Sequence, residues 1–179
     1  MGGMHAHVIL AAGQGTRMRS RLPKVLHPLL GKPMLLYALE AALALKPERL
    51  VVVVGHGGEK VVEALEGYPV EVAWQKEQLG TAHALLQAEG LLRDFPGPFL
   101  VTQGDTPLLS PRTLEALLRR VREGAGMALL TAELPDPTGY GRILREGEEV
   151  LGNVEEKDAP PEVRAIREAL DGNGFERVG

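Results

Sequence analysis

The chain has 179 residues, 44% of them apolar and 25% charged, and its net charge of −4 fits a soluble globular domain and argues against nucleic acid as a partner. Because it contains no cysteine, disulfides, thiolate catalysis and cysteine metal sites are excluded. No apolar run reaches the ~20 residues of a membrane span and the N-terminus lacks a signal-peptide pattern, so we expect a cytoplasmic protein without a membrane partner.

Strand and helix patterns alternate along the chain, which predicts an α/β fold with a mainly parallel sheet. Apolar runs predict strands over residues 8–12, 49–54, 70–74, 99–102 and 127–132, and a hairpin over 142–154. Helices are expected over 34–45, 59–65, 81–93, 110–123 and 160–169. Since no repeat or linker interrupts this order, we expect one domain spanning residues 1–179.

The first predicted strand runs into a loop that is rich in glycine and positive charge. Gly13 and Gly15 let the main chain approach a ligand, and four cations follow within eight residues: Arg17, Arg19, Arg21 and Lys24. Met18 stands where a Rossmann fingerprint needs its third glycine, and no Gly-Lys-Ser/Thr triplet of a P-loop occurs. The loop therefore indicates a nucleoside triphosphate site, the alternative being a solvated turn with surface arginines.

A carboxylate follows the strand over 99–102. Ligands of open α/β sheets gather at the carboxyl ends of the strands, so Asp105 should lie on the same edge as the glycine loop. Mg²⁺ takes one or two carboxylates together with phosphate oxygens and water, which makes Asp105 a candidate metal ligand. On spacing alone, an aspartate that merely forms a turn before Thr106-Pro107 is an equally good explanation.

A third segment combines two glutamines, a glycine and a threonine, in the order Gln75, Gln78, Gly80, Thr81. Side-chain amides carry both a donor and an acceptor, as the imide edge of a pyrimidine requires. Without the neighbouring motifs, a helix N-cap with two surface glutamines would be the better interpretation. We expect His56 and His83 to be structural, because no pair of histidines has metal-ligand spacing.

These motifs resemble, in order and spacing, those of the sugar-nucleotide pyrophosphorylases, and within them the uridylyltransferase domains of the bifunctional N-acetylglucosamine-1-phosphate uridylyltransferases. The resemblance covers Val8 to about Glu168 and rests on L-A-A-G-Q-G-T-R-M, P-K-V-L, V-G-H-G, Q-x-x-Q-L-G-T-A-H-A, G-D-T-P-L, D-P-T-G-Y-G-R-I and V-E-E-K-D-A. It implies a Rossmann-like mixed, mostly parallel sheet flanked by helices, of the nucleotide-diphospho-sugar transferase type.

The resemblance also implies roles for residues at matching positions. Arg17, Lys24 and Asp105 would be catalytic, with Asp105 the ligand of a Mg²⁺ cofactor, and Gly141 and Glu155 would contact the sugar. The implied nucleotide-binding residues are Leu10, Ala11, Ala12, Gly13, Gly15, Thr16, Gln75, Gln78, Gly80, Thr81, Gln103 and Gly104. The implied substrates are UTP and a sugar 1-phosphate, with N-acetylglucosamine 1-phosphate expected, and pyrophosphate is released on the route to cell-wall precursors.

The sequence departs from the family pattern in its last part. Gln103 replaces an aromatic or apolar residue, Leu170 replaces an asparagine that contacts the sugar, and the chain ends before a second metal-binding asparagine and the hexapeptide repeats. We therefore expect a domain incomplete at its C-terminus, whose uncovered sheet edge is compatible with a homo-oligomer, and which binds nucleotide but turns it over poorly. The alternatives are a cytidylyl- or guanylyltransferase acting on another phosphorylated acceptor, and a remnant that only binds nucleotide.

Overall fold

The structure, a computed structural model, describes residues 3–13, 21–136, 138, 141–147 and 149–154. Its contacts divide the chain into two compact units, Met1–Arg119 and Arg120–Gly179. Several predictions fall on residues that the structure does not describe: the roles of Gly15, Thr16, Arg17, Arg19 and Glu155, the change at Leu170, and the helix over 160–169. Among the described residues, no helix has both the length and the apolar character needed to cross a membrane.

The first unit is built on a parallel four-stranded sheet with the order β5-β4-β1-β6. Its strands are β1 (Ala6–Ala11), β4 (Arg49–Val54), β5 (Glu71–Trp74) and β6 (Phe99–Gln103). Every residue of β1, and all of β4 except Arg49, is buried. Such apolar runs belong to strands covered on both faces, so the predicted α/β class and the parallel sheet are confirmed.

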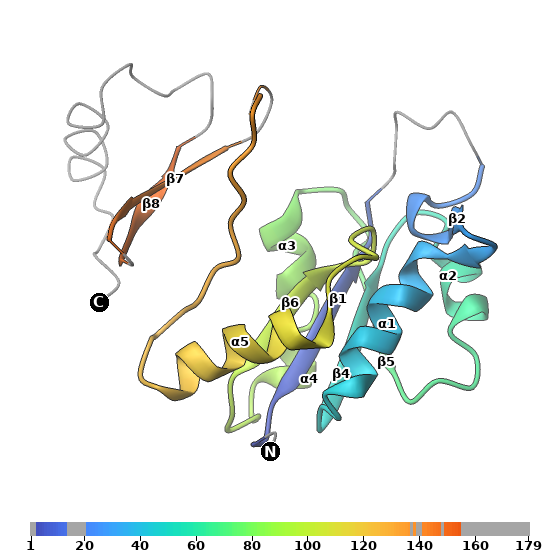
Figure 1. The fold of residues 1–179 in the computed structure, drawn as a ribbon. Helices are drawn as coiled ribbons and strands as arrows, with labels where there is room; N and C mark the ends of the chain where they lie inside the picture. Colours follow the sequence, from blue (N-terminus) through green and yellow to red (C-terminus); the bar gives the residue numbers. More distant parts are fainter. Residues whose placement is uncertain (1–2, 14–20, 137, 139–140, 148, 155–179) are drawn as a thin grey trace. The chain divides into compact units, whose positions relative to one another are not determined.

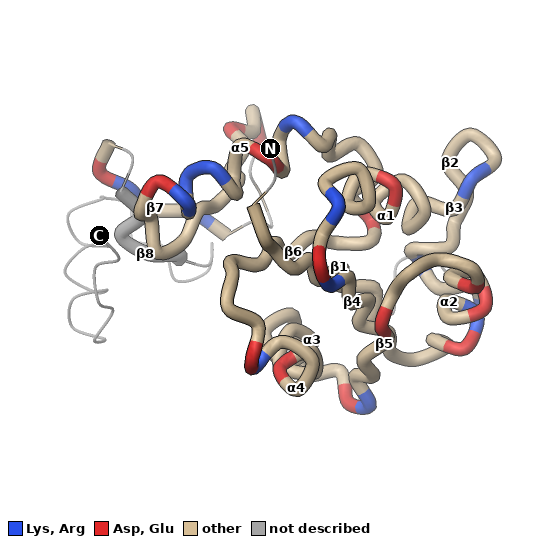
Figure 2. The backbone as a smooth tube through the Cα atoms, turned by 90° about the horizontal axis from the view of Figure 1, so that it is seen from below, with Lys and Arg blue, Asp and Glu red and all other residues tan. Residues whose placement is uncertain are grey.

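Helices cover both faces of this sheet (Figure 1). One face carries α1 (Met34–Ala44), α2 (Gly58–Ala64) and α5 (Pro111–Arg122), and the other carries α3 (Thr81–Leu86) and α4 (Glu89–Leu92). Because side chains alternate along a strand, Ile9 packs with the α1 and α2 side, whereas Val8 packs with the α3 and α4 side. Charged residues of this unit lie mainly on the helices and connecting loops (Figure 2).

A short connection holds Lys24 in place between the glycine loop and α1. It consists of a 3-10 helix, η2 (Lys24–Leu26), and a small antiparallel pair, β2 (Pro28–Leu29) and β3 (Lys32–Pro33). Val25 and Leu26 are both buried in the core beneath α1. The backbone at Lys24 is therefore anchored although its side chain reaches the surface.

The predicted helix over 81–93 is divided into α3 and α4. The side chain of Gln87 donates a hydrogen bond to the backbone oxygen of His83 at 2.9 Å, the oxygen that its own backbone N–H would use in a regular α-helix. That N–H bonds the oxygen of Ala84 instead, at 3.1 Å. The competition of a polar side chain for a helical carbonyl accounts for the break.

The second unit confirms one predicted element and contradicts another. β7 (Arg142–Glu146) and β8 (Glu149–Val154) form the predicted antiparallel hairpin. The strand predicted over 127–132 is wrong, since this segment has no regular structure. A strand needs a partner for its backbone hydrogen bonds, and none of the described strands pairs with this segment.

The core of the first unit contains a histidine that is neutral when folded. His7 on β1 is fully buried, and its Nε2 lies 2.9 Å from Oγ1 of Thr102. Its Nδ1 has no partner among the described residues. Burial, with a smaller contribution from the neighbouring charge of His5, lowers the pKa of His7 to about 4.

We expect His7 to make folding sensitive to mild acid. Well above pH 6.5 the His7 ring is neutral in both the folded and the unfolded state, so it does not lower the stability. Below pH 6.5 the ring binds a proton in the unfolded chain, whereas in the folded chain it stays neutral until about pH 4. The free energy of unfolding should therefore fall by about 2 kcal/mol between pH 7.5 and 5 through this residue alone. Urea denaturation at the two pH values measures this loss.

His7→Gln is the matched variant, because its side-chain amide can still bond Thr102 but does not titrate. The variant should lose about 2 kcal/mol less than the parent over the same pH interval. Equal acid sensitivity of the two proteins would show that other groups cause it.

Candidate functional site

A pocket opens at the carboxyl-terminal edge of the sheet in the first unit. Its empty volume, open mouth included, is about 440 Å³. It is lined by Leu10, Ala12, Gly13, Gln75, Gln78, Gly80, Thr81, Ala84 and Gln103. All of these except Ala84 belong to the nucleotide-binding set predicted from the sequence, so residues from three separate segments meet at one site.

The fold explains why these segments meet. Parallel strands β1 and β6 end side by side, with Leu10 opposite Gln103 in the register, and the turn after β5 brings in the residues from Gln75 to Gly80. Gly80 has φ +96°, in the left-handed region that favours glycine. Its carbonyl accepts the N–H of Ala84 at 3.0 Å and so starts α3.

A second glycine permits a close approach between two of the pocket segments. The side-chain amide of Gln78 donates a hydrogen bond to the oxygen of Ala12 at 2.6 Å. A Cβ on Gly55, which follows β4, would lie 2.8 Å from that oxygen and 2.9 Å from the amide nitrogen. The glycine of V-G-H-G is therefore needed for the bond between the glycine loop and the glutamine turn, a role that the sequence alone does not disclose.

Gln75 occupies the floor of the pocket and is only 4% exposed. Its Nε2 lies 3.1 Å from the oxygen of Gly80 and 3.0 Å from Nδ1 of His83. The sequence predicts a structural role for His83, but the structure places it against the residue predicted to bind the base. Residue type and spacing do not reveal this contact, because it depends on how the turn folds back onto α3.

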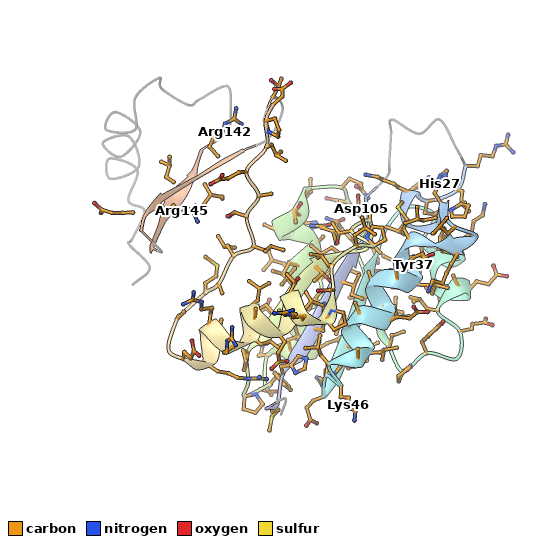
Figure 3. All side chains as sticks on the ribbon, in the orientation of Figure 1. His27, Tyr37, Lys46, Asp105, Arg142 and Arg145 are labelled. Carbon is orange, nitrogen blue, oxygen red and sulfur yellow. The ribbon has the colours of Figure 1, made fainter. Side chains whose placement is uncertain are left out.

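Two of the three predicted catalytic residues are paired with each other. Nζ of Lys24 lies 2.7 Å from Oδ2 of Asp105, and their side chains are 43% and 30% exposed. Asp105 lies just beyond β6, at the end of the sheet that carries the pocket (Figure 3). The structure thus brings a cation and a carboxylate together at this edge.

The donor set fits Mg²⁺ delivered with phosphate. Among the described residues, no group of three or more His, Asp or Glu side chains could hold a metal ion. Asp105 offers one partly exposed carboxylate, and Mg²⁺ typically takes one or two carboxylates while phosphate oxygens and water complete its shell. Asp105 can therefore share an ion with a bound triphosphate but does not form a metal site alone.

Two predicted nucleotide-binding residues of the first unit, Ala11 and Gly104, do not line the pocket. Ala11 is buried in the core on the α1 face. Gly104 bonds the oxygen of Leu10 at 2.8 Å, and a Cβ there would lie 3.0 Å from Cγ1 of Val25, so both residues support the pocket from below. Gly141 is exposed in the second unit, directly before β7. The predicted roles of Gly15, Thr16, Arg17 and Glu155 stay predictions.

Comparisons with known proteins identify the relatives of this chain. The chain is 98% identical over 169 residues to the bifunctional protein GlmU of Thermus thermophilus, and the match covers 94% of this chain and 37% of that protein. It also resembles a nucleotidyl transferase structure from Methanothermobacter thermautotroptrophicus, at 32% identity and a TM-score of 0.56 over 69% of this chain and 59% of the other. The chain thus spans about a third of the length of its curated relative.

A second solved structure supports the fold alone. UDP-glucose pyrophosphorylase complexed with UDP-glucose matches 98% of this chain and 83% of its own, with a TM-score of 0.68 at 24% identity.

The model of the MobA-like NTP transferase domain matches residues 7–170. The relationship to nucleotidyltransferases that the sequence predicts is therefore confirmed, and the chain belongs to the family of MobA-like NTP transferase domains.

Proposed function

We propose that this chain is one nucleotidyltransferase domain that makes a UDP-sugar from UTP and a sugar 1-phosphate, with N-acetylglucosamine 1-phosphate as the acceptor. The observation that carries the proposal is the pocket in which Gln75, Gly80 and Thr81 lie beside the end of β1. The pocket combines polar, hydrogen-bonding glutamines with Gly13, the first residue of the glycine and cation segment expected to hold phosphates. The 98% identity to a GlmU protein supports the choice of substrates.

The reaction requires positioning and charge stabilisation more than a protein nucleophile. An oxygen of the sugar phosphate attacks the α-phosphorus of UTP, the bond from that phosphorus to the bridging oxygen breaks, and pyrophosphate leaves with the electron pair. The ammonium group of Lys24 would stabilise negative charge on the phosphates. A Mg²⁺ bound by Asp105 would supply further charge neutralisation.

The base and the phosphates would then be held by different parts of the site. The glutamine turn and α3 would bind uracil in the pocket, while Lys24 and Asp105, 2.7 Å apart, would face the triphosphate. Contacts with the base on one side and with the phosphates on the other would fix the position of the α-phosphorus. This matters because small displacements of reacting atoms lower the reaction rate strongly. We include Arg17 on the phosphates, and Gly141 and Glu155 on the sugar, in this proposal.

Base preference tests the proposed substrate. Calorimetric titration should show UTP binding at least tenfold tighter than CTP, ATP or GTP, because a site with specific hydrogen bonds penalises ligands that leave its polar groups unpaired. Pyrophosphate release should then require UTP together with N-acetylglucosamine 1-phosphate. Equal affinities for all four nucleotides would mean that Gln75 and Gln78 have a structural role and do not select the base. Another nucleotidyltransferase reaction would then be favoured.

A further inference from the structure

Both hydrogens of the Gln75 side-chain amide are used inside the protein. The oxygen of Gly80 can only accept, so the atom 3.1 Å away from it must be the amide nitrogen of Gln75. The same nitrogen lies 3.0 Å from Nδ1 of His83 and donates its second hydrogen there. A residue that is 4% exposed thus has two satisfied donors, and a rotated amide would place its oxygen against another acceptor.

This arrangement also fixes the tautomer of His83. To accept from Gln75, Nδ1 must carry a lone pair, so the hydrogen of the neutral ring is on Nε2. The side-chain nitrogen of Gln87 lies farther away, 3.3 Å from Nε2, and it also donates to the backbone oxygen of His83 at 2.9 Å. A neutral imidazole has one acceptor nitrogen, and the shorter contact, with Gln75, identifies it as Nδ1.

Because both hydrogens of its amide are used, Gln75 presents only its side-chain oxygen, a hydrogen-bond acceptor, to a ligand. No described residue donates a hydrogen bond to its side-chain oxygen, and Gln75 lines the pocket. The uracil ring carries a hydrogen on N3, whereas cytosine carries a lone pair there. An oxygen held in this position therefore bonds the imide of uracil and repels the corresponding edge of cytosine.

We propose that His83 is a positioning residue that, with the carbonyl of Gly80, holds the Gln75 amide with its oxygen toward the base and so selects uridine over cytidine nucleotides. The inference rests on the proposed function, because it assumes that the pocket binds the base. It assigns His83 a role in specificity without contact with the reacting atoms.

Two substitutions at one position separate positioning from mere packing. His83→Leu fills similar space but cannot accept a hydrogen bond, so the ratio of CTP to UTP dissociation constants should fall by about tenfold as the amide gains freedom to rotate. His83→Asn can present an oxygen close to the position of Nδ1, and should keep the ratio within about twofold of the parent. Gln87→Met, which removes the contact at Nε2, is the control and should leave the ratio unchanged.

The outcomes distinguish this inference from the proposed function. A parent protein without preference for UTP contradicts the proposed function itself. If the parent has that preference, equal ratios for His83→Leu and His83→Asn overturn the role of His83. Nitrogen-15 NMR of the His83 imidazole in the unsubstituted protein tests the tautomer and does not depend on whether a variant folds. The proposal requires the hydrogen on Nε2, and a hydrogen on Nδ1 overturns it.

Discussion

Replacing Asp105 with asparagine should lower the rate of pyrophosphate release by about two to three orders of magnitude, the loss typical of a charge-stabilising group in an active site. The substitution keeps the shape of the side chain but removes the charge that binds Mg²⁺. It also removes the partner of Lys24, 2.7 Å away. Steady-state kinetics with UTP and N-acetylglucosamine 1-phosphate measure the rate.

Calorimetry with and without Mg²⁺ shows whether the metal is the cause. UTP should bind the parent more tightly when Mg²⁺ is present, and the affinity of Asp105→Asn should depend little on the metal. Asp94→Asn is the matched control, because Asp94 is exposed in the turn that precedes β6, at the other end of that strand. Tight, metal-dependent binding of UTP by Asp105→Asn would refute the assignment of the ligand.

The two central strands of the sheet could be predicted because they are apolar on both faces. β1 and β4 lie at the centre, where helices on either side remove the need for alternating polarity, and both occur where the sequence predicted strands. β6 is easily located as well, since Gly104 and Asp105 end its apolar run. Local composition was sufficient wherever burial was nearly complete.

The errors occur where structure depends on a partner that composition does not show. The apolar run over 127–132 has the residues of a strand, but strand formation needs a second strand for its hydrogen bonds. The break between α3 and α4 arises from one side chain, that of Gln87, which takes a helical carbonyl. A pattern of apolar residues contains neither kind of information.

The site shows the same division between composition and tertiary geometry. Strand order was enough to predict that Asp105 and the glycine loop lie at one edge, because parallel strands end together, whereas Gln75, Gln78 and Gln103 were assigned to the nucleotide through the family resemblance. The roles of Gly55 and His83 could not be foreseen, since one depends on the close approach of Ala12, whose oxygen would lie 2.8 Å from a Cβ on Gly55, and the other on a hydrogen bond of 3.0 Å with Gln75. Such contacts follow from the path of two turns, and not from the residue types in either.

Lys24→Met should weaken binding of UTP by about 10- to 100-fold, as expected for a charge-assisted contact with phosphate, and should leave the affinity for uridine unchanged. Methionine has similar length and apolar character but no charge, so it tests the ammonium group alone. Titration with UTP and with uridine separates the phosphate contacts from the base contacts. The fold should persist, because a partly exposed ion pair such as that of Lys24 and Asp105 contributes at most ~1 kcal/mol to stability.

Lys46→Met is the control for loss of a positive charge, since Lys46 lies at the end of the first unit opposite Asp105 (Figure 3). This control should bind UTP and uridine like the parent, whereas Lys24→Met should lose affinity only for the triphosphate. Equal losses for UTP and uridine in Lys24→Met would mean that Lys24 maintains the shape of the site through its pair with Asp105. A partly exposed ion pair should change the melting temperature only slightly. A large fall in the melting temperature of Lys24→Met would therefore show that the pair with Asp105 stabilises the fold.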